Sequence, residues 1–299
     1  MYLTIAVLTM NRSKQLKEAI ESVIACILPK ETEIVVLDNA STDDTESVIN
    51  EITKDSSVPI RYYYSSVNTG VGGGRAKLFD YANGKYVYFL DDDAIISPDC
   101  KDEFFTTSID YMDNNTNVAS VTTQIYDELL GYSRTEDFSD KVQIDGKPVM
   151  FKYLGGSHFL RKEYFDSPLY FNIKYGSEEY APSIIAMNKG FYHVFNKDIS
   201  IIHKPARNKW VDGSSDMRDV QIRYVAIIYA TKKLLYPMIF QPILYLGYKK
   251  RSKMYLSMYP GATKDARKMV REIIKENKCK KIRVMSVIKM FKTFGMTAF

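Results

Sequence analysis

Short apolar runs alternate with amphipathic stretches along the first hundred residues. The runs are rich in β-branched and aromatic side chains, as strands are, whereas the stretches between them repeat apolar residues at helical spacing. This alternation predicts a parallel sheet with crossover helices. The expected strands are residues 3–9, 33–39, 60–66 and 85–93, and the expected helices are residues 13–26, 41–52 and 74–82. Ser41 is the expected N-cap of the second helix.

The pattern continues beyond residue 100 in a less regular form. Residues 118–126 and 190–203 read as strands, and the stretch between them reads as a helix that Gly190 ends. These elements predict an α/β fold in which a Rossmann-like, mixed and mainly parallel sheet is flanked by helices. We expect this sheet to form one domain over residues 1–205.

A loop and a basic helical region are expected at residues 206–299. From Leu246 onward, 15 Lys and Arg stand against 3 Asp and Glu, a net charge of about +12, whereas residues 1–245 carry about −7. Residues 224–248 are apolar and aromatic, but lysines and prolines interrupt them too often for a membrane span. We expect this region to contact an anionic membrane surface, and packing against the core or oligomerisation is the alternative. No nucleic-acid-binding motif accompanies the charge, so no nucleic-acid partner is expected.

The composition is that of an ordinary globular chain, with 45% hydrophobic and 26% charged residues. Cys26, Cys100 and Cys279 have no C-x-x-C spacing, which favours neither a zinc site nor a disulfide framework. The apolar N-terminal segment is too short for a signal peptide or a membrane anchor. We therefore expect a cytoplasmic protein, either free or bound peripherally at the inner face of the cell membrane.

Three consecutive aspartates end the strand expected at residues 85–93. Carboxylates this close together repel one another, so Asp91, Asp92 and Asp93 are costly unless a cation neutralises them. Mg²⁺ and Mn²⁺ are hard cations that accept carboxylate and phosphate oxygens together. The triplet therefore indicates a divalent metal that carries a diphosphate, and a solvated acidic turn is the alternative.

Other polar residues follow neighbouring strands, and the carboxyl ends of such strands are where α/β sheets bind phosphate ligands. Asp38 and Asn39 can hydrogen-bond a nucleotide base, although an Asx turn is the alternative. Arginines suit bidentate phosphate contacts, and glycines let the backbone approach a ligand closely. The candidate donor-binding residues are Thr9, Asn11, Arg12, Asp38, Asn39, Gly73, Arg75, Asp91 and Asp92.

The order of these motifs resembles the family 2 glycosyltransferases, inverting enzymes of the A-type nucleotide-sugar-binding fold. The resemblance covers residues 1–205 and implies a nucleotide-binding half at 1–100 and an acceptor half at 101–205. It rests on "LTMNR", "VVLDNASTDDT", "NTGVGGGRA", "FLDDD", "LGGSHFLRKEYF", "YGSEEY" and a strand that ends at His203.

The resemblance also implies roles for individual residues. Asp91 would lie nearest the ribose and Asp93 would ligate Mn²⁺ or Mg²⁺, with Asp91 and His203 as further ligands. A structural histidine at a strand end is the alternative for His203. Glu178 and Glu179 match the family's acidic pair, and Glu179 is the expected base. Many members have Asp at that second position, which leaves the register of the pair open.

The implied activity is transfer of one sugar from a nucleotide-diphosphate sugar, with a UDP-sugar favoured, to a glycan, lipid-linked or protein-linked acceptor. Cell-surface polysaccharide or glycoconjugate synthesis is the expected setting. Processive synthases of the family carry a Q-x-x-R-W signature, which this sequence lacks. The loop with Trp210 could close over the donor or stack against a sugar, and a half-buried tryptophan without such a role is the alternative. A nucleotidyltransferase and a degenerate member that only binds glycan or scaffolds a complex are the alternative functions.

Overall fold

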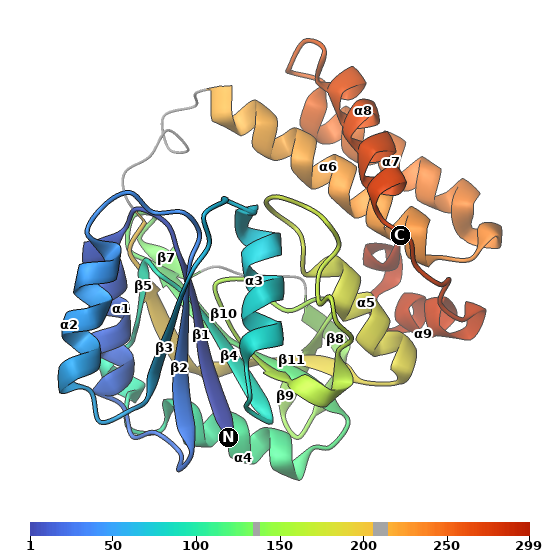
Figure 1. Ribbon diagram of the computed structural model, residues 1–299. Helices are drawn as coiled ribbons and strands as arrows, with labels where there is room; N and C mark the ends of the chain where they lie inside the picture. Colours follow the sequence, from blue (N-terminus) through green and yellow to red (C-terminus); the bar gives the residue numbers. More distant parts are fainter. Residues whose placement is uncertain (134–137, 206–214) are drawn as a thin grey trace.

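The strand and helix alternation predicted for the first hundred residues is confirmed (Figure 1). The computed structural model describes residues 1–133, 138–205 and 215–299, so Trp210 lies outside the described residues. The first strands are β1 (Leu3–Thr9), β2 (Thr32–Asp38), β3 (Ile60–Tyr64) and β4 (Tyr86–Asp91). The helices between them are α1 (Ser13–Ile24), α2 (Thr45–Asp55) and α3 (Gly70–Tyr81).

The second half of the sheet is mixed. Its strands are β5 (Ala94–Ile96), β6 (Val118–Asp127), β7 (Tyr132–Ser133), β8 (Phe138–Ile144), β9 (Lys147–Met150), β10 (Ser157–Arg161) and β11 (Tyr192–His203), and its helices are α4 (Phe104–Asn114) and α5 (Tyr180–Lys189). The strand order is β3-β2-β1-β4-β10-β6-β11-β9-β8. β10 is antiparallel to both β4 and β6, whereas β11 is parallel to β6. The predicted α/β fold with a mixed, mainly parallel sheet is therefore confirmed.

Helices cover both faces of the sheet. Along β4, Tyr88 faces a core shared with α1 and α4, whereas Phe89 faces the core that contains α3. Successive side chains of a strand point to opposite faces, so a strand covered on both sides is apolar throughout. This explains the uninterrupted run of five buried residues before the aspartates.

The predicted N-cap of the second helix is wrong. α2 begins at Thr45, four residues after Ser41, and Asp44 precedes it. The Ser41 hydroxyl instead accepts a hydrogen bond from the backbone N–H of Asn11, at 2.8 Å. Ser41 therefore belongs to the loops beyond β1 and β2.

In the described residues, four α-helices follow the sheet and form the predicted helical extension. They are α6 (Ser215–Leu235), α7 (Gln241–Leu256), α8 (Ala262–Glu276) and α9 (Val284–Phe294). α6 packs against α7, α8 and α5, and apolar side chains of α5, α6 and α9 share one core (Figure 1). Of the helices in the described ranges, none is both long and apolar enough to cross a membrane.

Candidate active site

The carboxyl ends of the parallel strands lie along one edge of the sheet. β1, β2 and β4 are parallel, and β4, β6 and β11 run the same way because β10 is antiparallel to its two neighbours. This edge carries Thr9, Asp38, Asp91, Asp127 and His203. The short strand β5 pairs with the end of β11 and sets His203 opposite Ala94, which brings the imidazole next to Asp93.

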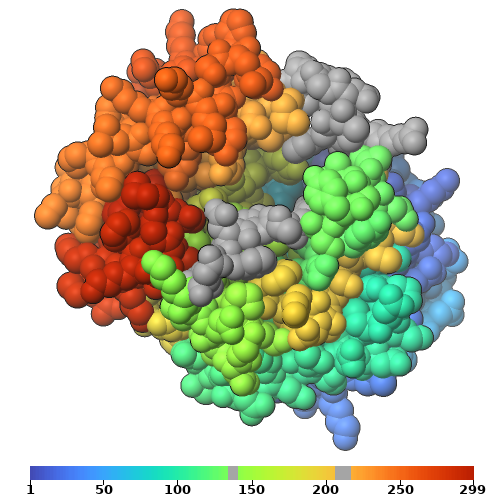
Figure 2. Space-filling model, turned by 180° about the vertical axis from the view of Figure 1, so that it is seen from behind, coloured from blue at the N-terminus to red at the C-terminus, as the bar shows by residue number. Residues whose placement is uncertain are grey.

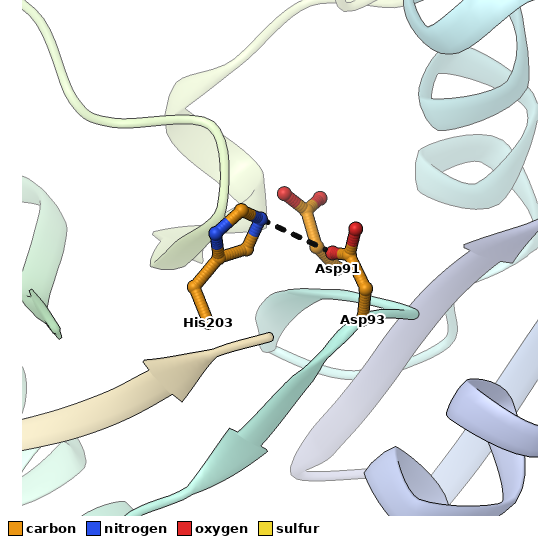
Figure 3. A group of neighbouring side chains, drawn as sticks. All are labelled: Asp91, Asp93 and His203. Atoms are coloured by element: carbon orange, nitrogen blue, oxygen red, sulfur yellow. Dashed lines mark ion pairs between the residues drawn. The ribbon is translucent and has the colours of Figure 1, made fainter. Parts of the chain in front are cut away.

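Asp91, Asp93 and His203 form a group that could hold a cation. One ligand atom from each lies within 4.8 Å of the others. Figure 3 shows the two carboxylates and the imidazole turned toward one another, with Nε2 of His203 3.3 Å from Oδ1 of Asp93. On the other side of the ring, Nδ1 lies 3.0 Å from Oδ2 of Asp127. Two carboxylates and an imidazole fit a divalent metal, and a carboxylate behind the histidine is typical of metal-bound histidines.

Arg12 neutralises the other side of the aspartate triplet. Its Nη1 lies 2.9 Å from Asp92 and 2.7 Å from Asp93, and the Thr9 hydroxyl donates to Asp92 at 2.8 Å. Burial, and then repulsion by Asp93, raises the pKa of Asp92 to about 6 against the opposing effect of Arg12. Burial would also raise the pKa of Asp93, but the hydrogen bond with His203 lowers it. These contacts from Arg12, Thr9 and His203 offset part of the repulsion expected among the three carboxylates.

Arg75 joins the triplet to the acidic pair. Its guanidinium pairs with Asp91, and Nη1 lies 3.2 Å from Glu178 and 3.5 Å from Glu179. Burial alone would lower the pKa of Arg75, but Asp91 and Glu178 raise it above its usual value. The side chain is therefore a fixed positive charge at the centre of three carboxylates.

Glu179 immediately precedes α5 and is buried. Burial, and then the charge of Glu178, raises the pKa of Glu179 to about 7. Gly155 makes room for this arrangement, because a Cβ at that position would overlap Oε1 of Glu179 and lie 2.8 Å from Nη1 of Arg75. A carboxyl group with a pKa near neutrality suits general-base chemistry.

The glycines at the start of α3 contact protein. A Cβ on Gly70 or Gly72 would overlap backbone carbonyls of residues 173–174, and one on Gly73 would lie 2.8 Å from the Thr69 side chain. Gly70 also has a φ of +74°, which favours glycine. These glycines let the segment before the acidic pair pack closely against α3, and ligand contact by Gly73 stays a prediction.

Asp38 and two asparagines already have partners within the loops. Asp38 accepts hydrogen bonds from the Tyr62 hydroxyl at 2.8 Å and from the Ser41 N–H at 2.7 Å. Asn39 accepts from the Thr69 N–H at 3.0 Å, and the Asn11 side chain accepts from a loop N–H at 2.7 Å. The Ser41 N–H is three residues after Asp38, so this bond is a loop contact and not the Asx turn expected as the alternative. Base contacts by these residues stay predictions.

Three site residues lay outside the sequence-based candidates. Asp127 orients His203, Gly155 makes room for Glu179, and Tyr62 fixes one oxygen of Asp38. Asp127 follows a predicted strand, so the rule that ligands gather at strand ends could have found it. Gly155 lies within the quoted motif "LGGSHFLRKEYF", but its contact with Glu179 depends on the fold.

The surface is hollowed beside this edge of the sheet. Seen from behind in Figure 2, the hollow lies between the orange and red C-terminal helices and the green segment around β7. β7 pairs with the end of β6 at Tyr126 and Asp127, so the hollow adjoins the residues around His203.

Comparison with known proteins identifies the family. The profile of "Glycosyl transferase family 2" matches residues 4–175. The GalNAc(5)-diNAcBac-PP-undecaprenol beta-1,3-glucosyltransferase of Campylobacter jejuni is 38% identical over 92 residues. That alignment covers 30% of this chain and 29% of the relative, so the chain matches less than a third of the length of this curated enzyme.

Two solved structures share the fold. TarS 1–349 of S. aureus in complex with UDP-GlcNAc has a TM-score of 0.66 at 15% identity, with 100% of this chain and 89% of that chain covered. The mannosyltransferase PcManGT of Pyrobaculum calidifontis in complex with GDP-Man and Mn²⁺ has a TM-score of 0.59 at 13% identity, with 99% and 80% covered. The profile match spans more than half of the sequence and confirms the resemblance that the order of motifs indicated: the chain belongs to glycosyl transferase family 2.

Proposed function

We propose that the protein is a metal-dependent inverting glycosyltransferase. It moves a single sugar from a nucleotide-diphosphate sugar to a glycan, lipid-linked or protein-linked acceptor. The observation that carries this proposal is a pair of ion-pair clusters that meet at the aspartate triplet. Asp93 contacts His203 and Arg12, whereas Asp91 contacts Arg75, which in turn contacts Glu179. A cation site and a carboxyl group with a pKa near 7 thus lie at one edge of the sheet.

Asp93, Asp91 and His203 are the proposed ligands of Mn²⁺ or Mg²⁺. Such a metal neutralises charge on the leaving diphosphate when bound. The two carboxylates in the ligand set suit either ion, and Mn²⁺ is supported by its presence in the mannosyltransferase complex of similar fold. A test of metal content therefore includes both ions.

Donor recognition is assigned to the residues around the loops after β1, β2 and β4. A UDP-sugar is the favoured donor, supported by the UDP-GlcNAc complex of TarS. A lipid-linked acceptor is supported by the Campylobacter jejuni relative, whose name contains an undecaprenol-linked glycan. The proposed contacts are those of Thr9, Asn11, Arg12, Asp38, Asn39, Gly73, Arg75, Asp91 and Asp92.

Glu179 is the proposed base. With its pKa near 7, its carboxylate can take the proton of an acceptor hydroxyl while the diphosphate leaves from the opposite face of the sugar. Arg75 holds both glutamates and Asp91, so it fixes the base relative to the donor side. Within the described part of the chain, Oε2 of Glu178 is buried and has no partner, which leaves it free to accept a hydrogen bond from a sugar hydroxyl.

A thermal-shift panel of nucleotide sugars tests this proposal. A ligand that binds only the folded state raises its stability by RT ln(1 + [L]/Kd), so the true donor should raise the melting temperature in the presence of Mn²⁺ or Mg²⁺ and much less in EDTA. A nucleotidyltransferase would instead respond to nucleoside triphosphates, and a glycan-binding scaffold to glycans alone. Cytoplasmic location at the inner membrane face stays a prediction.

A further inference from the structure

A pocket with basic lining residues lies between α7 and α8. These two helices belong to the C-terminal helical region (Figure 1). The volume of the pocket is about 230 Å³, and Lys249, Lys253 and Arg267 are among the residues that line it. No carboxylate is among its described lining residues. This volume is below the ~300–1,000 Å³ of pockets that enclose drug-sized ligands, so it suits a small group such as a phosphate.

Two hydroxyl groups in the pocket wall lack partners. Tyr248 is 4% exposed and Ser252 is 7% exposed, and both line the pocket. Neither Oη of Tyr248 nor Oγ of Ser252 has a hydrogen-bond partner among the residues that the structure describes. Buried polar groups are almost always hydrogen-bonded, so two such donors beside three cations indicate a missing oxyanion.

An apolar groove of about 470 Å³ adjoins the pocket. Leu234, Met238, Pro242 and Ile274 are among its lining residues, and Tyr245 lines both the groove and the pocket. Met238 is 74% exposed, and Lys233 and Lys281 also line the groove. A cationic pocket that continues into an apolar groove matches a ligand with an anionic head and a hydrocarbon chain.

We propose that α7 and α8 form a site for a phosphorylated lipid. The phosphate lies among Lys249, Lys253 and Arg267 and accepts a hydrogen bond from Ser252, and the hydrocarbon chain follows the groove past Met238. This site is separate from the residues assigned to sugar transfer, and its test does not depend on that reaction. The site gives Lys249, Lys253 and Arg267 a defined contact with a phosphate, in place of diffuse attraction to an anionic surface.

Calorimetric titration with a short-chain phosphatidic acid, below its micelle concentration, tests the proposal on the full chain. Saturable binding is expected, at least tenfold tighter than binding of glycerol 3-phosphate or inorganic phosphate, because only the lipid fills the groove. Equal affinity for the lipid and the two soluble phosphates would overturn the lipid assignment. Absence of saturable lipid binding would overturn the site itself.

Matched variants separate the pocket from general electrostatic attraction. Lys249→Ala and Ser252→Ala should each weaken lipid binding about tenfold, since each removes a contact to a charged group. Lys250→Ala removes the same charge from the next position of α7, outside the pocket, and should change binding less than twofold. Equal losses for Lys249→Ala and Lys250→Ala, with none for Ser252→Ala, would contradict a built site.

A second pair of variants tests the groove. Met238→Ser should weaken lipid binding and leave inorganic phosphate binding unchanged. Met258→Ser is its control, because Met258 is 71% exposed and lies outside both the pocket and the groove. If Met238→Ser binds the lipid as the unmodified protein does, the hydrocarbon chain does not occupy the groove and the proposal fails.

Discussion

Asp127 lies 3.0 Å from Nδ1 of His203, on the opposite side of the ring from Asp93. The two residues face each other because the ends of the parallel strands β6 and β11 are in register. A proton on Nδ1 donates to Asp127 and makes Nε2, which faces Asp93, the ring nitrogen that would ligate a cation. A carboxylate in this position orients a histidine ligand and makes it more basic.

Asp127→Asn should therefore weaken metal binding by a factor of about 10 to 100, which is typical of lost partners behind metal ligands. The substitution keeps the shape of the side chain but removes its charge. Titration with Mn²⁺, followed by electron paramagnetic resonance, measures the affinity. Asp99→Asn, at an exposed position, is the control. Unchanged Mn²⁺ affinity in Asp127→Asn would remove His203 from the ligand set.

Glu179→Gln should lower turnover by a factor of about 10² to 10⁴ and leave donor binding intact, because the amide keeps the shape but cannot accept a proton. Steady-state transfer rates and donor titrations measure the two effects separately. Glu51→Gln, at an exposed position of α2, is the control.

The same experiment on Glu178 tests the register of the acidic pair. If Glu178→Gln loses turnover and Glu179→Gln does not, the base is the first glutamate. Loss of turnover in neither variant would remove the pair from catalysis.

The pH profile provides an independent test of the base. Because Glu179 must be ionised to accept a proton and its pKa is about 7, kcat/KM should rise about tenfold per pH unit below 7 and level off above it. This limb should be absent from the residual activity of Glu179→Gln. A flat profile down to pH 5 would contradict the assignment.

The raised pKa of Glu179 makes stability fall as pH rises, whereas activity rises over the same range. Between the usual value of 4.5 and about 7, the folded state keeps a proton on Glu179 that the unfolded state has released. The free energy of unfolding should therefore fall as pH rises through this window. Urea titrations at several pH values should show a smaller fall for Glu179→Gln than for the unmodified protein.

Gly155→Ala should impair turnover more than Gly156→Ala. The added Cβ at residue 155 would overlap Glu179, whereas one at residue 156 lies 3.2 Å from the nearest atom of Asp91. Circular dichroism and transfer rates would distinguish a local displacement from unfolding. Equal rates for the two variants would show that the glutamate moves aside freely.

The alternating strands and helices of the first hundred residues could be predicted from the sequence, because each is specified by a pattern of neighbouring residues. Each strand of the first hundred residues is an apolar run between turn residues, and the aspartate triplet marks the end of β4. β10 was not predicted as a strand, because three of the five residues in "SHFLR" are polar or charged. Its burial comes from insertion between β4 and β6. The β8–β9 hairpin does have a local signal, which the predicted elements did not include: Asp145 and Gly146 form its two-residue turn, with φ angles of +46° and +76°.

The sequence predicted those residues of the candidate site that lie at the carboxyl ends of strands, but not the contacts between them. Asp93 and His203 are 110 positions apart, and β5 brings them together by pairing with β11. The contact of Arg75 with the acidic pair depends on glycines of α3 that let residues 173–174 pack closely against this helix. Ser41 is not the N-cap of α2 because it hydrogen-bonds Asn11 in a neighbouring loop. Such relationships arise from tertiary packing, which no local pattern encodes.

The most direct test of the central claim is release of nucleoside diphosphate from sugar nucleotides, measured for the unmodified protein and Asp93→Ala with Mn²⁺, Mg²⁺ or EDTA. The account predicts metal-dependent release by the unmodified protein with its donor, and loss of both release and metal-dependent donor binding in Asp93→Ala. Full activity of Asp93→Ala in EDTA would contradict it.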